Sequence, residues 1–122
     1  MTKERQALGR LGEELALRRV KSLGYQCIER NYRCPLGELD LIARDRDTLV
    51  FIEIRTRRGE STSHAKESID KRKRRTLSKV ALYYMKEKDC FGTQSRFDVV
   101  VVGIVGGRGE IEIIQNAFDL EY

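Results

Sequence analysis

The chain has 122 residues, of which 40% are hydrophobic and 35% are charged, and its formal net charge is +5. The length suits a single domain over residues 1–122, and the composition excludes a disordered chain. No apolar run approaches the roughly 20 residues of a membrane span, and the charged N-terminus lacks the apolar segment of a secretory signal. We therefore expect a cytoplasmic protein with no membrane partner, and the positive charge favours a polyanion such as nucleic acid.

Cysteine and histidine usage narrows the chemistry further. The three cysteines, Cys27, Cys34 and Cys90, are odd in number and have no CxxC spacing, which favours reduced thiols over a disulfide framework or a zinc site. The single histidine, His64, excludes a cluster of several histidines around a metal. Any bound metal ion is therefore expected to have oxygen ligands, which suits Mg²⁺ or Mn²⁺.

The first half of the chain is predicted to form a helix and three strands. Leucines at helical spacing indicate the helix, which Gly24 ends. Alternation of apolar and polar residues indicates the strands, and turn-forming residues separate them. We expect the helix at residues 3–23, strands at 25–32, 38–43 and 49–56, and turns at 34–37 and 44–47.

The second half is predicted to hold a long helix and two more strands. The helix begins with basic residues and continues with an apolar stripe, and a glycine-rich turn separates the two strands. We expect a polar loop at 57–63, the helix at 64–88, strands at 97–105 and 110–115, the second of them at an edge, and the turn at 106–109. The order α-β-β-β-α-β-β predicts an α/β fold with one central sheet covered by helices.

Acidic residues recur on two neighbouring predicted strands. Residues two apart on a strand share a face, so Glu38 is expected on the same side as Asp40. By the same rule Glu53 shares a face with Arg55. A hairpin centred on residues 46–47 places Asp40 roughly opposite Glu53, with Cβ atoms about 4.5–5.5 Å apart. Three carboxylates and one guanidinium are then expected to converge.

Two interpretations of this cluster remain open. Carboxylates that close repel one another, and a divalent cation held by their oxygens would relieve the repulsion. Such an ion polarises a phosphodiester and lowers the pKa of a bound water. The alternative is a solvated strand face, with Arg55 paired to Glu53 or Asp40 and Arg57 paired to Glu38.

Several other charged residues are candidates for a site. Glu13 lies beside the apolar stripe of the first helix, and it either faces the carboxylates or is a surface acid. The basic run 71–75 is the strongest polyanion-binding candidate, and its alternative is a solubilising start of the helix. The spacing of Arg96 and Asp98 suggests only the structure of a strand's start. The candidate nucleic-acid contacts are Lys71, Arg72, Lys73, Arg75 and Arg57.

The pattern Asp40-x12-Glu53-x-Arg55 resembles the PD-(D/E)xK nuclease signature, an acid on one strand followed by acid-x-lysine on the next. Most of the chain, from about residue 9 to 118, resembles the YraN-like family of small bacterial proteins. The matching residues are Gly9-Arg10-x-Gly12-Glu13-x-x-Ala16, Gly24-Tyr25, Arg30-Asn31-Tyr32-Arg33, residues 37–42 and 49–57, Lys73, Ala81, residues 96–100 and Asn116-Ala117-Phe118.

This resemblance implies a restriction-endonuclease-like fold with a mixed sheet, similar to that of archaeal Holliday-junction resolvases. It implies that Asp40 and Glu53 bind Mg²⁺ or Mn²⁺, with Glu13 as a further acid and Glu38 as a neighbour. The implied activity is metal-dependent hydrolysis of phosphodiesters in DNA, with branched or damaged DNA as expected substrates. By analogy with related nucleases, a homodimer is expected.

Two departures from the signature leave catalysis open. Leu39, not proline, precedes Asp40, and Arg55 stands where the family usually has lysine. Lysine can orient or deprotonate a water, whereas arginine stays charged and instead suits a phosphate clamp. Lys73 is the candidate that replaces the missing lysine. Three hypotheses follow: a metal-dependent nuclease, a non-catalytic nucleic-acid-binding module with the same fold, and an assembly protein whose acids only pair with arginines.

Overall fold

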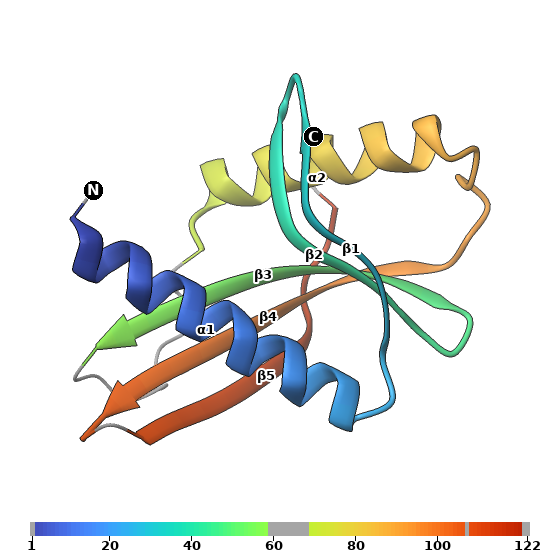
Figure 1. Ribbon diagram of the computed structural model, residues 1–122. Coiled ribbons are helices and arrows are strands. Elements are labelled where there is room, and N and C mark those ends of the chain that lie inside the picture. Colours follow the sequence, from blue (N-terminus) through green and yellow to red (C-terminus); the bar gives the residue numbers. More distant parts are fainter. Residues whose placement is uncertain (1, 59–68, 107, 121–122) are drawn as a thin grey trace.

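The computed structural model describes residues 2–58, 69–106 and 108–120 (Figure 1). Its elements confirm the predicted order α-β-β-β-α-β-β and are consistent with a restriction-endonuclease-like fold. They are α1 Lys3–Ser22, β1 Gln26–Cys34, β2 Gly37–Asp45, β3 Thr48–Arg58, α2 Lys71–Glu87, β4 Ser95–Val105 and β5 Arg108–Phe118. Among the described helices, none is long and apolar enough to cross a membrane.

The five strands form one mixed sheet in the order β1-β2-β3-β4-β5. Strands β3 and β4 are parallel, and the other neighbours are antiparallel. A parallel pair needs a crossover connection, and α2 lies within that crossover. Strand β5 lies at an edge, as predicted.

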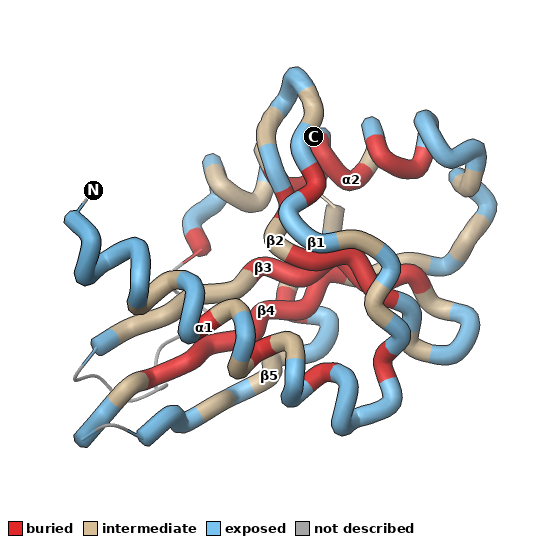
Figure 2. Tube along the Cα trace, viewed as in Figure 1, coloured by how far each residue is buried: buried red, intermediate tan, exposed pale blue. Residues whose placement is uncertain are grey.

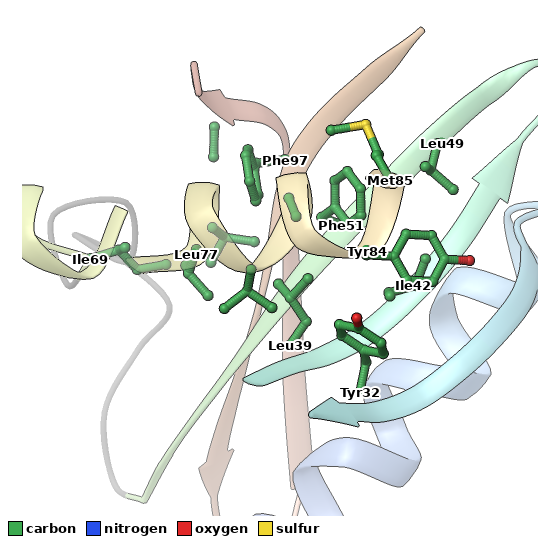
Figure 3. Packing of buried hydrophobic residues seen from close by; sticks show 14 of the residues in the cluster. Tyr32, Leu39, Ile42, Leu49, Phe51, Ile69, Leu77, Tyr84, Met85 and Phe97 are labelled. Atoms are coloured by element: carbon green, nitrogen blue, oxygen red, sulfur yellow. The ribbon is translucent and has the colours of Figure 1, made fainter. Parts of the chain in front are cut away.

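The two helices cover opposite faces of the sheet (Figure 1). Helix α1 packs on β3, β4 and β5, where Ala16 and Val20 join a cluster with Val50 and Val100. Helix α2 packs on β2. Its Tyr84 belongs to a second cluster of buried residues, which contains the aromatic rings shown in Figure 3. Figure 2 shows the buried residues concentrated in the central strands, between these two helices. The sheet is therefore covered on both faces, as its apolar strands predict.

Helix α2 begins later than predicted. Ile69 and Asp70 precede it without being helical, and the expected residues 64–68, with His64, lie outside the described residues. Asp70 is the N-cap: its Oδ1 accepts a hydrogen bond from the backbone N of Lys73 at 2.8 Å. An aspartate is a preferred N-cap, and its negative charge opposes the basic first turn that follows. The predicted polar loop also begins later, because β3 continues to Arg58.

Candidate functional site

Asp40 and Glu53 meet where β2 separates from β3. The antiparallel ladder runs from Asp45 opposite Thr48 to Leu41 opposite Ile52, the register of the predicted hairpin. One step further along that register lie Asp40 and Glu53. Instead of continuing the ladder, Asp40 accepts a hydrogen bond at its Oδ2 from the backbone N of Ile54 at 2.8 Å. The end of the ladder thus holds the Asp40 carboxylate against β3.

Glu53 is a buried acid beside two cations. Its side chain is 8% exposed, and its Oε2 lies 3.5 Å from Nζ of Lys73 and 3.6 Å from Nη2 of Arg55. Burial raises the pKa of Glu53 to about 8, helped by hydrogen bonding and charge repulsion with Asp40, while Lys73 and Arg55 act in the opposite direction. At neutral pH the Asp40–Glu53 pair therefore tends to retain a proton.

Arg55 forms the expected ion pair with Glu53, but not on a solvated face. Its partner is buried, so the pair is formed at a cost in desolvation. The Arg55 Nε is buried, and within the described residues it has no hydrogen-bond partner. An ordinary surface ion pair has neither property, so this geometry favours the site interpretation of the cluster.

Glu13 reaches the same region from α1. It is half-buried, and its pKa is raised by burial and then by the negative charge of Asp40. It lines a cavity of about 370 Å³ together with Arg55 and Ile54. Of the two interpretations of Glu13, the structure thus favours the one in which it faces the carboxylates.

Glu38 lies at the exposed margin of this group. Its carboxylate pairs with Arg33 at 3.3 Å, and the two side chains are 61% and 80% exposed. Leu39 packs in the cluster under α2, whereas Leu41 packs in the cluster under α1. The alternation of faces therefore does not continue through Asp40, because β2 bends away from β3 there. Both Glu38 and Asp40 nevertheless act to raise the pKa of Glu13 by charge repulsion, Asp40 the more strongly, so both carboxylates lie near α1.

The donor set at Asp40 and Glu53 fits a hard divalent cation. Mg²⁺ is typically held by one or two carboxylates, with water or phosphate oxygens completing its shell. Within the described residues, no group of three or more histidine, cysteine or acidic side chains is placed to hold a metal. Two adjacent carboxylates remain as the candidate ligands, and the pKa of one of them, Glu53, is raised first by burial and then by the other, Asp40.

The basic candidates divide into two groups. Lys73 projects from α2 to the Glu53 carboxylate and is 39% exposed. Lys71, Arg72 and Arg75 are exposed on the first turns of the same helix, and Arg57 is half-buried near the end of β3. Lys73 is thus the basic-run residue that the structure joins to the carboxylates.

A second polar cluster was not anticipated from sequence. Asp98 is buried on β4 and accepts hydrogen bonds from the hydroxyl of Tyr25 (2.8 Å), from Nε of Arg96 (2.9 Å) and from the backbone N of Asn116 (3.0 Å). Arg96 also donates to Asp45 at 2.9 Å. An acid at the start of the apolar run of β4 is the available signal, but two of its three partners, Tyr25 and Asn116, come from the linker before β1 and from β5.

Comparison with known proteins agrees with the residue pattern. The profile of the uncharacterised protein family UPF0102 matches residues 12–102. A UPF0102 protein of Desulfosudis oleivorans is 45% identical over 119 residues, covering 98% of this chain and 95% of the relative. One from Moorella thermoacetica is 42% identical over 97% of this chain and all of its own length (100%), and one from Syntrophus aciditrophicus is 40% identical over 93% and 90%. The chain belongs to the UPF0102 family, which is the YraN family that its motifs resemble.

Proposed function

We propose that this protein is a metal-dependent nuclease that hydrolyses phosphodiester bonds in DNA, with branched or damaged DNA as its expected substrate. The observation that carries the proposal is the Asp40–Glu53 pair, held where β2 leaves β3, with Lys73 at the buried carboxylate. Buried acids with strongly raised pKa values beside a cavity are characteristic of functional sites.

Asp40 and Glu53 are the residues that would hold Mg²⁺ or Mn²⁺. The ion's contribution would be to polarise the phosphodiester and lower the pKa of a bound water. The backbone N–H of Ile54 orients the Asp40 carboxylate. Arg55 stays charged, so its role is to bind the phosphate and stabilise the negative charge that develops on it.

Lys73 supplies what Arg55 lacks. Its Nζ lies 3.5 Å from Glu53 Oε2, and it arrives from α2 rather than from β3, where the signature places lysine. A lysine ammonium changes its pKa with its surroundings, so it can orient a water and exchange a proton with it. We assign Lys73 the role of the missing lysine.

A non-catalytic nucleic-acid-binding module is the second candidate function, and one observation favours it. Lys73 and Arg55 already offset the charge of Glu53, and Glu53 tends to keep its proton at neutral pH. In that case the two cations stabilise the fold, and DNA binding needs no metal.

Cleavage assays on plasmid and branched DNA with Mg²⁺ or Mn²⁺ separate the two functions. For the nuclease, wild-type protein cleaves and Lys73→Met lowers the rate by about 100-fold, a typical loss for a proton-transfer group. Lys79→Met is the matched control, because Lys79 is an exposed lysine of α2 away from Glu53, and its rate should equal wild type.

If wild-type protein cleaves no substrate, the variant Arg55→Lys distinguishes a nuclease site silenced by arginine from a binding module. Gain of cleavage by Arg55→Lys would show that arginine silenced a nuclease site. If neither form cleaves any substrate while DNA remains bound, the nuclease proposal fails and the binding module stands.

A further inference from the structure

A groove runs along the seam between α1 and β3 and ends beside the candidate site. The cavity of about 370 Å³ is lined by Arg5 and Gly9 of α1 and by Arg55 and Thr56 of β3, with Glu13 at one end. A second cavity, also of about 370 Å³, shares Arg5 and extends to Arg58. Both cavities are lined by Arg5 and Leu8, so they lie next to each other along the seam, and we refer to the pair as the groove. Each cavity has a volume within the usual range of ligand sites, about 300–1,000 Å³.

Gly9 forms part of the groove wall, and the packing of the chain does not require a glycine there. A Cβ atom added at Gly9 would meet nothing within 4 Å. At Gly12, one turn away, an added Cβ would overlap the side chain of Thr56, so close helix–sheet packing explains that glycine. Glycine is unfavourable inside a helix, and close approach of a ligand to the backbone is a recognised reason for its presence.

The charges along the groove favour a polyanion, because three arginines, Arg5, Arg55 and Arg58, line the two cavities against two acids, Glu4 and Glu13. Arg5 and Arg58 are exposed and form no ion pair with any described residue. Arg55 keeps a buried Nε without a partner in the described part of the chain. Guanidinium groups bind phosphate oxygens well because they donate several hydrogen bonds in a fixed plane. The acidic end of the groove, at Glu13, is the end near Asp40.

We propose that this groove binds the sugar–phosphate backbone of one nucleic-acid strand and leads it to Asp40 and Glu53. The inference rests on the proposed action on nucleic acid. It places the strand between α1 and β3, with Gly9 as the point of closest approach and Arg5 and Arg58 as phosphate contacts. Of the basic run of α2, Lys73 reaches Glu53 at the inner end of the groove, whereas α2 itself covers the opposite face of the sheet from α1.

A series at Gly9 tests the groove by filling it. The probe is a short fluorescein-labelled single-stranded oligonucleotide, and its anisotropy is measured in EDTA so that cleavage does not interfere. The Kd should rise in the order Gly9→Ala, Gly9→Gln, Gly9→Glu, by about tenfold for glutamine and more for glutamate, because a phosphate contact is lost and a negative charge is added. Melting temperatures should stay equal to wild type or rise, since each residue favours a helix more than glycine does.

The variant Arg5→Ala tests whether the positive charge of Arg5 contacts a phosphate. It should weaken binding and lower the slope of log Kd against log salt by about one, as expected for the loss of one phosphate contact. Arg18→Ala is the matched control, because Arg18 is exposed on the same helix and does not line the groove.

If Gly9→Glu and Arg5→Ala bind like wild type, or if wild-type protein binds no oligonucleotide, the groove assignment is wrong. Cleavage is read out separately. Wild-type protein that binds through the groove but never cleaves would refute the nuclease alone, whereas cleavage with unaltered binding in the groove variants would refute the groove alone.

Discussion

Two buried carboxylates lie on the neighbouring parallel strands β3 and β4, and they differ in how their charge is satisfied. Asp98 is 1% exposed and Glu53 is 7% exposed, so burial alone does not distinguish them. Asp98 accepts close hydrogen bonds from Tyr25, Arg96 and Asn116. Such a fully bonded carboxylate is a structural element, because its desolvation is offset within the fold.

Among the described residues, Glu53 has no comparable set of donors. Its two cations lie at 3.5 and 3.6 Å, and the nearby Asp40 carboxylate contributes to raising its pKa to about 8. A buried acid whose ionisation is opposed by desolvation and by a neighbouring carboxylate gains most from an added cation. This difference assigns the polar network on β4 to the fold, whereas the acid on β3 is the one that we propose binds a metal ion.

The largest effect is expected at Asp98. Asp98→Ala leaves Arg96 half-buried without its main partner and should lower the free energy of unfolding by about 3–5 kcal/mol. Urea denaturation followed by circular dichroism measures this loss. A loss no larger than that of a surface substitution would contradict the structural role given to the network.

The substitution Glu53→Gln should instead raise the free energy of unfolding, by an amount that depends on pH. The pKa of Glu53 is about 8 in the folded protein against an ordinary value of 4.5, so the folded state holds a proton that the unfolded state releases. Ionising Glu53 in the folded state therefore lowers the free energy of unfolding. This loss is absent below about pH 4.5, grows as the pH rises and is complete above about pH 8, with a slope of at most about 1.4 kcal/mol per pH unit.

Glutamine resembles the protonated acid and removes this cost. The free energies of unfolding of Glu53→Gln and wild type, measured by urea denaturation from pH 4 to pH 9 without metal, should therefore diverge with rising pH, by at most about 5 kcal/mol at the upper end. A variant that is less stable by the same amount at every pH would show that Glu53 is a structural acid like Asp98.

Tyr25→Phe should have a smaller effect than Asp98→Ala. It removes a hydroxyl that donates to Asp98 and accepts from Gln115 at 2.7 Å. Loss of such buried bonds costs about 1–3 kcal/mol. The same denaturation measurement applies, and an unchanged midpoint would mean that Arg96 and Asn116 satisfy Asp98 by themselves.

Glu38→Ala should have the smallest effect. Its ion pair with Arg33 is exposed, and exposed pairs contribute less than about 1 kcal/mol. Its melting curve should overlay that of wild type. A marked change would mean that Glu38 belongs to the carboxylate site after all.

The sequence predicted the fold well because local patterns determine most of it. Alternating residues located β2 and β3, and the polar turn between them set the register that brings Asp40 to Glu53. The sequence makes Lys73 the candidate replacement for the missing lysine, and in the structure its Nζ lies 3.5 Å from Glu53 Oε2. The start of α2 was missed because the Asp70 cap competes with a longer helical pattern.

The features that sequence patterns do not predict depend on contacts between residues far apart in the chain. Two-residue spacing groups Glu38 with Asp40, but it does not reveal that Glu38 is exposed and paired with Arg33 while Asp40 bonds to β3. The partners of Asp98 are 73 residues away at Tyr25 and 18 residues away at Asn116, so no local pattern reveals them. The groove likewise depends on α1 lying along β3.

Calorimetric titration of Mn²⁺ into the metal-free protein tests the central claim most directly. The proposed site predicts that wild-type protein binds the ion, that Asp40→Asn abolishes binding and that Asp45→Asn, at the other end of β2, retains it. Binding at pH 7 should also release a proton, seen as a dependence of the heat on the buffer, because the ion displaces the proton that Glu53 holds. Wild-type protein that binds no Mn²⁺, or an Asp40→Asn variant that binds it unchanged, would contradict the claim.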